Sequence, residues 1–441
     1  MKHELKTFVL LNIFTIFFGI FLVYFLFNSS FIVPDYYVCT NITEQSFTFL
    51  SNNFNMNYPV SCDQNEYFSG FKDFEFIILT DHAYQQRPLY IFLVYILNLL
   101  FSPLFSLLNI NETFGILISV FLIHSFVLNY SLLLIMKLIN IKKIKYFDLF
   151  FIVILNLLHP MAKWEIFEAN NWMFTLLQIV LPVYLMKGYG KLTPNIAFVF
   201  GLLFLIHRGM IVSFLTYIFL VYAYKERIKI VNIIKNLLIF TFPFALYRGY
   251  FIINNLKPFD TNTENFRQFV WIIDYFTWGG DRKYGEYFCQ RIPGFIKCYF
   301  DGTINLINYM SVPFIISIIC LVVLYKKNNK HFQWTIITFL SLYSFWSLTG
   351  WYPMRFIYYS LGVLINFLLI YGYFKLNKNY LSKALYSLPL ITYFSFLTMW
   401  NNPDPDKYID DQYIYYSLFI LFIYFLYNYK FIYRNISKKS N

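Results

Sequence analysis

Charged residues are scarce in this chain of 441 amino acids, of which only 13% are Asp, Glu, Lys or Arg. Ordinary globular chains carry about 25% charge. Glycine and proline are also few, at 16 and 15 residues, which excludes a collagen-like or low-complexity disordered chain. Five cysteines are too few for a secreted disulfide module. The chain instead has 59% hydrophobic residues, with 55 Phe and 40 Tyr, which indicates a membrane protein.

Long apolar runs recur along the whole chain. Residues 8–27 and 356–374 are each long enough to cross a ~30 Å hydrocarbon core as a helix, which takes about 20 residues. We predict an all-α, polytopic transmembrane bundle that forms a single integral membrane domain over residues 1–441, with about twelve crossings. The predicted crossings are 8–27, 113–136, 147–160, 171–186, 195–207, 210–224, 231–251, 303–325, 332–348, 355–374, 384–400 and 413–429.

The formal net charge of +12 is explained by the placing of basic residues on one side of the membrane, so it does not indicate a nucleic-acid partner. Loops that stay in the cytoplasm retain Lys and Arg. With the amino terminus inside, the inner loops hold most of the 35 basic residues but only Glu4, Asp148 and Glu226 of the 23 acids. The first run is too long for a signal peptide and lacks a small-x-small cleavage site. We therefore predict a cell-membrane protein, such as one of a bacterial inner membrane, with both termini cytoplasmic.

The two longest predicted external regions are 28–112 and 252–302. The first contains an apolar segment, 88–108, that we interpret as a re-entrant or membrane-surface element interrupted at Ser102-Pro103. A full crossing at this segment would move the lysine-rich loop at 141–145 to the outside, against the charge rule. The alternative, a true crossing here with a further crossing elsewhere, stays open.

Four cysteines fall in the predicted external regions. Cys39 and Cys62 share the first region, Cys289 and Cys298 share the second, and Cys320 lies in a predicted helix. Two pairs on one face are typical of an oxidising compartment. Unpaired small residues are an equal alternative, because spacing does not establish pairing.

Ionisable residues at predicted helix ends are the candidate functional groups, because such groups are costly beside a membrane and tend to mark function. In the segment SCDQNEYFSGF, Asp63 and Tyr67 are four residues apart and share a face if the segment is helical. Phe68 and Phe71 then form an adjacent apolar stripe, as in a helix that lies on the membrane. Arg87 follows in the sequence Gln-Arg-Pro-Leu-Tyr, and an arginine at the interface is suited to bidentate binding of phosphate.

These features resemble the first external loop of the GT-C superfamily of glycosyltransferases, membrane enzymes that depend on polyprenyl-phosphate sugars. The resemblance rests on an acid with Tyr four residues later, a juxtamembrane helix and an Arg-Pro-Leu-Tyr step into an apolar segment. Further along, Glu168 in the sequence WEIFEANNW matches the family's second acid. The sequence His207-Arg208-Gly209, and Arg355 in Tyr-Pro-Met-Arg-Phe, are similar to the family's arginines at helix ends.

The resemblance implies a GT-C-like fold and a transferase for a polyprenyl-linked sugar that enters from the membrane lipid. A glycan, lipid or protein on the external face would be the acceptor. Arg87, with Arg208 or Arg355, would neutralise the phosphate of the donor. Tyr67 and His207 would complete the substrate site.

Asp63 is the implied base that removes a proton from the acceptor hydroxyl. Asp35 is a rival, because it lies at the distance from the first helix where the family often carries its key acid. Glu168 would position the acceptor or help to hold a divalent cation, and the resemblance implies no other cofactor. The pattern departs from the family in one further respect, since Arg87-Pro88 stands where many members have Pro-Pro.

Each candidate also has a purely structural interpretation. Asp63 can cap a short helix, Tyr67 can anchor an interface, and an arginine can extend its charge to the membrane surface. His207 at an apolar helix end can be packed and hydrogen-bonded without a role in chemistry.

Two other functions stay open. A polysaccharide polymerase or ligase of the O-antigen kind would use the basic residues of the 252–302 loop. These are Arg267, Arg282, Lys283, Arg291 and Lys297. A transporter or lipid flippase would show paired inverted repeats, and the sequence shows no convincing repeat.

Overall fold

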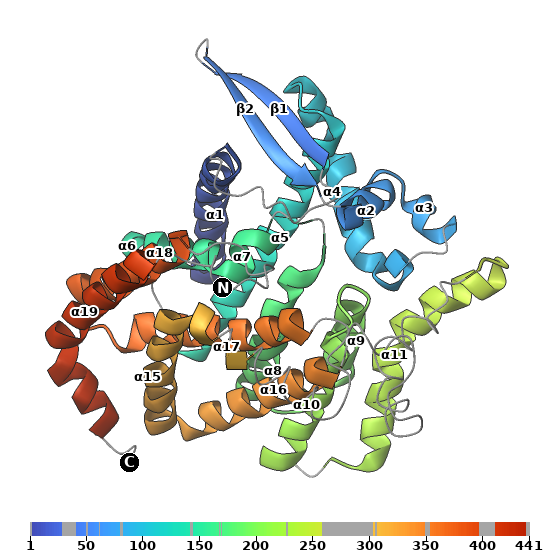
Figure 1. The fold of residues 1–441 in the computed structure, drawn as a ribbon. Coiled ribbons are helices and arrows are strands. Elements are labelled where there is room, and N and C mark those ends of the chain that lie inside the picture. The colour runs from blue at the N-terminus through green and yellow to red at the C-terminus, as the bar shows by residue number, and fades with distance from the viewer. Residues whose placement is uncertain are drawn as a thin grey trace, which may run out of the picture.

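Helices dominate the computed structural model, and a pair of strands lies at the top of the view in Figure 1. The structure describes residues 2–28, 41–49, 52–60, 62–79, 83–141, 144–166, 168, 170–225, 228–257, 303–304, 307–348, 353–396 and 411–437. The helices at the predicted crossings are α1 (Lys2–Asn28), α5 (Glu112–Leu138), α6 (Tyr146–Leu158), α8 (Leu176–Gly188), α9 (Pro194–Phe204), α10 (Met210–Tyr224), α11 (Ile230–Ile253), α15 (Ser311–Lys327), α16 (Asn329–Leu348), α17 (Pro353–Lys375), α18 (Tyr380–Phe396) and α19 (Asp411–Ser437). Further elements are α2 (Cys62–Lys72), α3 (Phe74–Leu79), α4 (Pro88–Leu107), α7 (Pro160–Glu165) and the 3-10 turns η1 (Ala83–Gln86) and η2 (Trp172–Thr175).

The predicted helical class is confirmed, because each predicted crossing overlaps a helix of the structure. In the described part of the chain, four helices are long and apolar enough to cross a membrane, judged by length and composition: α1, α4, α5 and α11. Others, such as α6 and α10, are apolar but shorter. The number of twelve crossings and the GT-C-like fold remain predictions.

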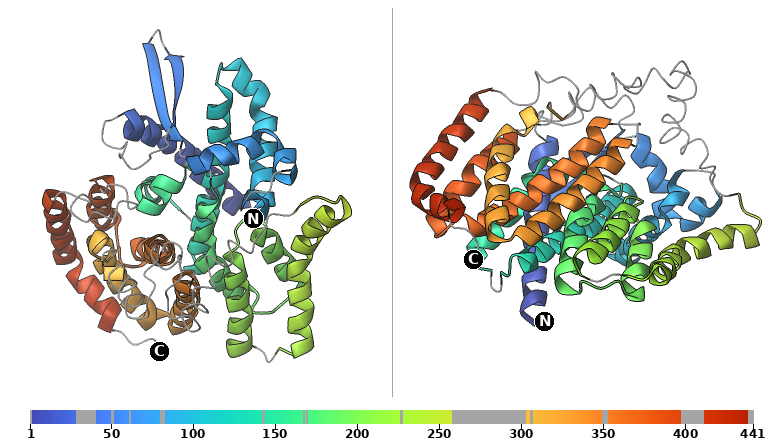
Figure 2. Two further views of the ribbon diagram at one scale, coloured as in Figure 1. Left: turned by 45° about the vertical axis from the view of Figure 1, so that its right-hand side comes forward. Right: turned by 90° about the horizontal axis from the view of Figure 1, so that it is seen from below.

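The helices form a bundle that extends from α18 and α19 at one edge to α9 and α11 at the other. α18 and α19 pack together at one edge, α9 and α11 pack together at the other, and α5 and α8 lie between them (Figure 2). Buried side chains of α5, α8, α10 and α17 belong to one continuous apolar core. Cys320 is buried in α15, as predicted, and Cys62 begins α2. Cys39, Cys289 and Cys298 lie outside the described residues.

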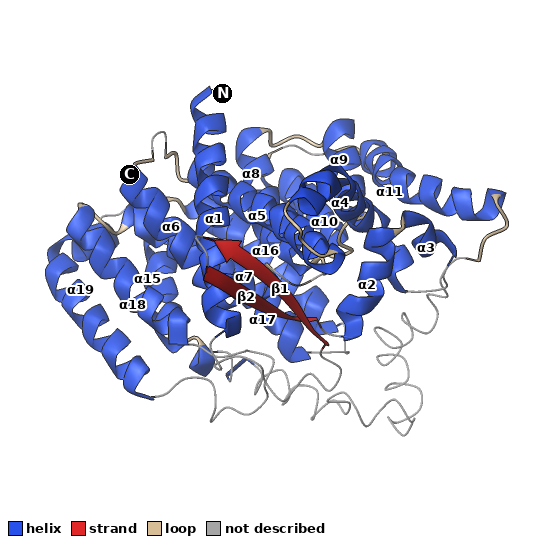
Figure 3. Cartoon of the chain, turned by 90° about the horizontal axis from the view of Figure 1, so that it is seen from above, coloured by secondary structure: helices blue, strands red, loops and turns tan. Residues whose placement is uncertain are grey.

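A β-hairpin in the first predicted external region was not expected from the all-α prediction. Strands β1 (Asn41–Phe49) and β2 (Asn52–Val60) pair antiparallel, with Asn41 opposite Val60 and Phe49 opposite Asn52. β2 contacts α1 and β1 contacts α5, and the hairpin lies in front of the helices in the view of Figure 3. Apolar residues recur at every second position of β2 from residue 54 to 60, which is the period of a strand.

The predicted interruption at Ser102-Pro103 is wrong, because α4 runs through both residues without a break. Proline lacks the N–H that would bind the carbonyl of Leu99, four residues earlier. The Ser102 hydroxyl donates to that same carbonyl at 3.0 Å. A serine side chain that satisfies the freed carbonyl allows proline to remain inside an apolar helix. α4 packs along α5 and also contacts α2 and α3.

Ion pairs and hydrogen bonds gather at one end of the bundle, which the sequence places in the cytoplasm. Glu4 of α1 pairs with Lys137 of α5 at 3.2 Å. Asp148 of α6 pairs with Lys383 of α18 at 2.6 Å and accepts a hydrogen bond from Tyr373 at 3.0 Å. Residues that the charge rule assigns to one side are therefore neighbours in space.

Candidate functional site

Arg87 lies immediately before α4 and contacts α2. Its guanidinium donates a hydrogen bond to the hydroxyl of Tyr67, and the guanidinium carbon lies 5.9 Å from the centre of the Tyr67 ring. Tyr67 is 4% exposed, and Phe68 and Phe71 of the same helix are also buried. The ring of Phe71 packs 5.8 Å from that of Tyr90 in α4. The apolar stripe of α2, which we predicted to lie on the membrane, is turned into the protein.

The amino end of α4 makes the position of Arg87 electropositive. A helix N-terminus carries roughly half an elementary positive charge and N–H groups without partners in the helix. Arg87 adds a full charge at this end, although cations are normally favoured at the opposite end of a helix. Its side chain makes no capping hydrogen bond to α4, and Pro88 occupies the first helical position, where its missing N–H costs nothing. A cation at a helix N-terminus is suited to hold an anion such as a phosphate.

His124, in the middle of α5, links α4 to the chain after α7. Its Nδ1 lies 3.1 Å from the carbonyl oxygen of Ile166, and its Nε2 lies 3.2 Å from the Tyr90 hydroxyl. Because a carbonyl only accepts, Nδ1 carries the hydrogen and Nε2 accepts from Tyr90. The two rings also stack, with centres 5.9 Å apart and planes 9° from parallel. These contacts fix the segment that follows α7 against α4 and α5.

That segment carries two acids. Glu165 is buried and accepts a hydrogen bond from Tyr359 in α17. Glu168 is half-buried and accepts one from the side-chain amide two residues later. Arg87, Glu165 and Glu168 all lie near enough for their charges to act on the hydroxyl of Tyr90.

His207 lies in the turn between α9 and α10. Its Nδ1 is 3.1 Å from Nε2 of Gln178 and 3.2 Å from the backbone nitrogen of Gly209. Because both groups donate to Nδ1, the hydrogen of the ring sits on Nε2. Burial and the charge of Arg87 lower the pKa of His207 to about 3, so the ring is a neutral donor at physiological pH. We define the Arg87 cluster as Tyr67, Arg87, Tyr90, His124, Glu165, Glu168 and His207.

A buried lysine fastens the segment with the acids to α18. Lys163 is 2% exposed, and its Nζ donates to the carbonyl oxygens of Phe394 at 3.2 Å and Ser395 at 3.3 Å. These carbonyls belong to the last turn of α18, where the helix dipole favours a cation. Burial lowers the pKa of Lys163 to about 8. Because Glu165 lies two residues further on, this contact also fixes where that carboxylate stands.

The structure brings four of the predicted site residues together. Tyr67 and Arg87 are in direct contact, and Arg87 lies near enough to act electrostatically on His207. Glu168 belongs to the same group through its effect on Tyr90. Arg208 is half-buried in the turn that also holds His207.

The other predicted residues are only partly described. Asp63 lies in α2, one helical turn before Tyr67, which confirms the predicted helix in this segment. Arg355 lies in the first turn of α17, four residues before Tyr359. The structure describes the backbone at Asp63 and Arg355 but not their side chains, and Asp35 lies outside the described residues, as do most of the loop 252–302 and the basic residues within it.

Four residues of this region were missed as candidates: Tyr90, His124, Glu165 and Tyr359. A signal existed for His124, because an ionisable residue inside a predicted crossing indicates function. Glu165 stands three residues before Glu168, and the sequence offered no reason to prefer it. Tyr359 belongs to the site through a contact with Glu165 across 194 positions of the chain, which no local pattern could reveal.

Within the described residues, no group of three His, Cys, Asp or Glu side chains is placed to hold a metal ion. Glu165 and Glu168, the acids of the Arg87 cluster, each accept a hydrogen bond from a neighbouring side chain instead. Comparisons with protein-family models, with curated proteins and with solved structures gave no match.

Proposed function

We propose that the chain is a membrane glycosyltransferase that moves a sugar from a polyprenyl phosphate to a hydroxyl acceptor, with the Arg87 cluster as its site. The acceptor is a glycan, lipid or protein on the external face. The proposal includes a GT-C-like bundle of about twelve crossings in a cell membrane. The four helices with the length and apolarity of a membrane span support this setting.

The observation that carries the proposal is the place of Arg87. A fixed guanidinium stands at the positive end of α4, hydrogen-bonded to Tyr67 and near enough for its charge to act on His207. The phosphate of a lipid-linked sugar carries negative charge, and that charge increases as the phosphate leaves. Fixed donors aimed at a developing charge stabilise it more than mobile solvent does.

The transfer then proceeds in one displacement. A carboxylate removes the proton of the acceptor hydroxyl as the oxygen attacks the anomeric carbon of the donor. The bond between that carbon and the phosphate oxygen breaks, and the polyprenyl phosphate leaves with the bonding electrons. A single displacement inverts the configuration of the sugar. A base must approach the hydroxyl to about 2.6–3.2 Å.

We propose Asp63 as this base, with Asp35 as the rival. Support for Asp63 comes from its position in α2, one turn before the tyrosine that holds Arg87. Glu168 is the proposed contact to the acceptor, because it is half-buried and lies near Arg87 and Tyr90. Arg208 and Arg355 are proposed as further contacts to the phosphate.

The test is a transfer assay in membranes with undecaprenyl phosphate that carries a radiolabelled hexose. Arg87→Lys keeps the charge but loses the planar fork that binds phosphate in a bidentate manner. We expect at least a tenfold loss of transfer for Arg87→Lys and complete loss for Asp63→Asn. Arg248→Lys in α11 is the matched control, because Arg248 packs on Phe244 away from the cluster.

Normal transfer by Arg87→Lys would remove the proposed phosphate site, and normal transfer by Asp63→Asn would shift the role of base to Asp35. The products of a gene deletion separate the polymerase alternative. Loss of one sugar from every glycan supports a transferase, whereas glycans of one repeating unit indicate a polymerase.

A further inference from the structure

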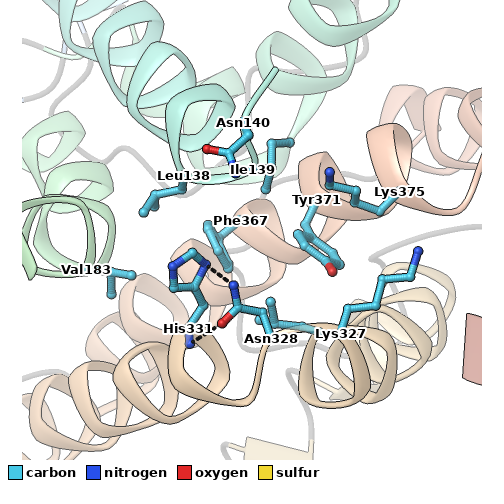
Figure 4. Close-up of a pocket in the computed structure, with 11 residues that line it drawn as sticks. Leu138, Ile139, Asn140, Val183, Lys327, Asn328, His331, Phe367, Tyr371 and Lys375 are labelled. Atoms are coloured by element: carbon cyan, nitrogen blue, oxygen red, sulfur yellow. Dashed lines mark hydrogen bonds between the residues drawn. The ribbon is translucent and has the colours of Figure 1, made fainter. Parts of the chain in front are cut away.

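A basic pocket lies at the ends of the helices opposite to the Arg87 cluster. It is a cavity of about 140 Å³ between the carboxyl ends of α5, α15 and α17 and the amino end of α16 (Figure 4). We call it the lysine pocket and define it by Lys327, Asn328, His331 and Lys375. Among the described residues, neither Asp nor Glu contributes to its lining.

The lysine pocket is separate from the Arg87 cluster, although the two share helices. On α5, His124 of the cluster and Leu138 of the pocket lining are 14 residues apart, which is about 21 Å along a helix. On α17, Tyr359 and Lys375 are 16 residues apart, or about 24 Å. The two sites therefore lie toward opposite ends of the same bundle, and the charge rule places the lysine pocket on the cytoplasmic side.

The positive charge of the pocket is not neutralised by the described protein. The ammonium groups of Lys327 and Lys375 have neither a hydrogen-bond nor an ion-pair partner among the described residues. Lys187, close by, uses its ammonium on the carbonyls of Lys137 and Leu138 at 2.8 and 2.9 Å, which cap the end of α5. Burial and the charge of Lys375 lower the pKa of both Lys187 and Lys327, which lie just beyond the predicted crossings.

The amino end of α16 adds neutral donors to the same space. The Asn328 side chain accepts from the backbone nitrogen of His331 at 3.1 Å and holds Nδ1 of that ring at 3.0 Å. Nδ1 therefore accepts from the Asn328 amide, and Nε2 carries the hydrogen. Burial and the charge of Lys187 lower the pKa of His331 to about 4, so the ring is neutral at physiological pH. α16 has 20 residues, and its dipole makes this end positive.

Lysines in the last turn of a helix often do no more than balance the helix dipole. Lys187 does so, since it binds the carbonyls at the end of α5. Lys327 and Lys375 also lie in the last turns of their helices, α15 and α17, but in addition they flank a cavity together with the amino end of α16. Two cations, a ring N–H and a helix N-terminus around one space are the elements of an anion site.

We propose that the lysine pocket binds a phosphate group, from either an anionic phospholipid or a small phosphate ester in the cytoplasm. A volume of about 140 Å³ is well below the ~300–1,000 Å³ of pockets for drug-sized ligands, so only the phosphate and its nearest atoms fit. Basic pockets between helices on the cytoplasmic side of a membrane recognise lipid headgroups by the same chemistry. The proposal does not depend on the glycosyltransferase function.

The test compares thermal unfolding of the full-length protein in neutral detergent and in lipid nanodiscs. Inorganic phosphate is titrated against chloride at equal ionic strength, and nanodiscs of phosphatidylglycerol are compared with nanodiscs of phosphatidylcholine. We expect phosphate or phosphatidylglycerol to raise the melting temperature. Stabilisation by free phosphate identifies a soluble ester, and stabilisation by phosphatidylglycerol alone identifies a lipid.

Lys375→Gln is the diagnostic variant and Lys330→Gln its control, because Lys330 is exposed and does not line the pocket. We expect Lys375→Gln to weaken binding about tenfold, the equivalent of about 1.4 kcal/mol. Without a ligand, Lys375→Gln should melt no lower than the parent protein, because it removes repulsion between lysines. Equal stabilisation of Lys375→Gln and the parent, or none by either probe, would overturn the proposal.

Discussion

Arg87 at the amino end of α4 donates a hydrogen bond to the hydroxyl of Tyr67, which lies 20 residues earlier in the chain. A guanidinium has five N–H donors in a rigid plane, so one bond to a fixed partner orients the others. Tyr67 is itself held by its ring contacts to Phe71 and Tyr90. The pair therefore positions a cation before any ligand arrives.

Tyr67→Phe tests this positioning role. The substitution keeps the ring and removes only the hydroxyl that Arg87 binds. We expect the KM for the lipid-linked donor to rise about tenfold, because a hydrogen bond to a charged group contributes about 1.5–3 kcal/mol. The change in kcat should be small. Tyr95→Phe is the control, since Tyr95 is a half-buried tyrosine of the neighbouring helix α4 and its ring packs near that of Phe74. Equal KM values for the two variants would contradict the positioning role.

The helices could be predicted from the sequence because the length of a run of apolar residues can be read from the residues themselves. The helix over 113–136 and its partner in the structure, α5, differ at each end by no more than two residues. Local sequence patterns gave a wrong prediction where a compensating contact decides whether a helix continues. Pro103 stays inside α4 because the Ser102 hydroxyl replaces the missing N–H donor. The prediction of a break considered only the proline and not this hydrogen bond.

The part of the candidate site that could be predicted consists of residues that lie close together in the sequence. Tyr67 and Arg87 were chosen from the motif that contains both, and they are in contact. Glu165 meets Tyr359, and Lys163 meets the end of α18, through contacts between distant segments. Such contacts depend on how whole helices pack, so a single sequence does not reveal them.

Gly209→Ala should destabilise the turn that holds His207. A β-carbon at Gly209 would clash with Nε2 of Gln178 and would lie 2.7 Å from the ring of Trp346. Both side chains would have to move, and overpacking of this kind costs about 1–3 kcal/mol. Gly249→Ala in α11 is the matched control, because a β-carbon there meets nothing within 4 Å. The control should be neutral or slightly stabilising, since Ala favours a helix over Gly. Equal melting temperatures of the two variants would show that Gln178 gives way without cost.

His207 should contribute to loss of stability in acid. Its pKa is about 3 in the folded protein, against about 6.5 in an unfolded chain. Between these values the unfolded state binds more protons, so the free energy of unfolding falls as the pH is lowered through this window. Above pH ~6.5 the contribution of His207 is complete. His207→Asn keeps an acceptor for Gln178 and Gly209 but does not titrate, so its melting temperature should fall less between pH 7 and pH 4. An unchanged dependence on pH would mean that His207 does not titrate differently on folding.

The pair of Asp148 and Lys383 should matter more for stability than an exposed ion pair. Both side chains are largely buried, and Asp148 also accepts from Tyr373. Asp148→Asn leaves a buried cation without its partner, which costs about 3–5 kcal/mol. Glu112→Gln breaks an exposed pair with Lys72 at the same distance of 2.6 Å, and should cost about 0–1 kcal/mol. The double variant Asp148→Asn with Lys383→Met should recover part of the loss. Melting temperatures of the three variants decide the matter, and equal effects of the two single changes would contradict the ranking.

Cysteine labelling across the bundle should place the connection between α4 and α5 outside and the lysine pocket inside. Leu108 follows α4 and is exposed, and Gly188 ends α8, where a β-carbon would meet nothing within 4 Å. In a background without the native cysteines, Leu108→Cys should react with a membrane-impermeant maleimide in intact cells. Gly188→Cys should react only after the membrane is opened.

The reverse pattern would mean that α4 is a full crossing, because one added crossing before α5 inverts every later helix. The lysines of the inner loops would then face outward, and the lysine pocket would meet the external solution. The labelling therefore decides which leaflet could supply a phosphate to the lysine pocket.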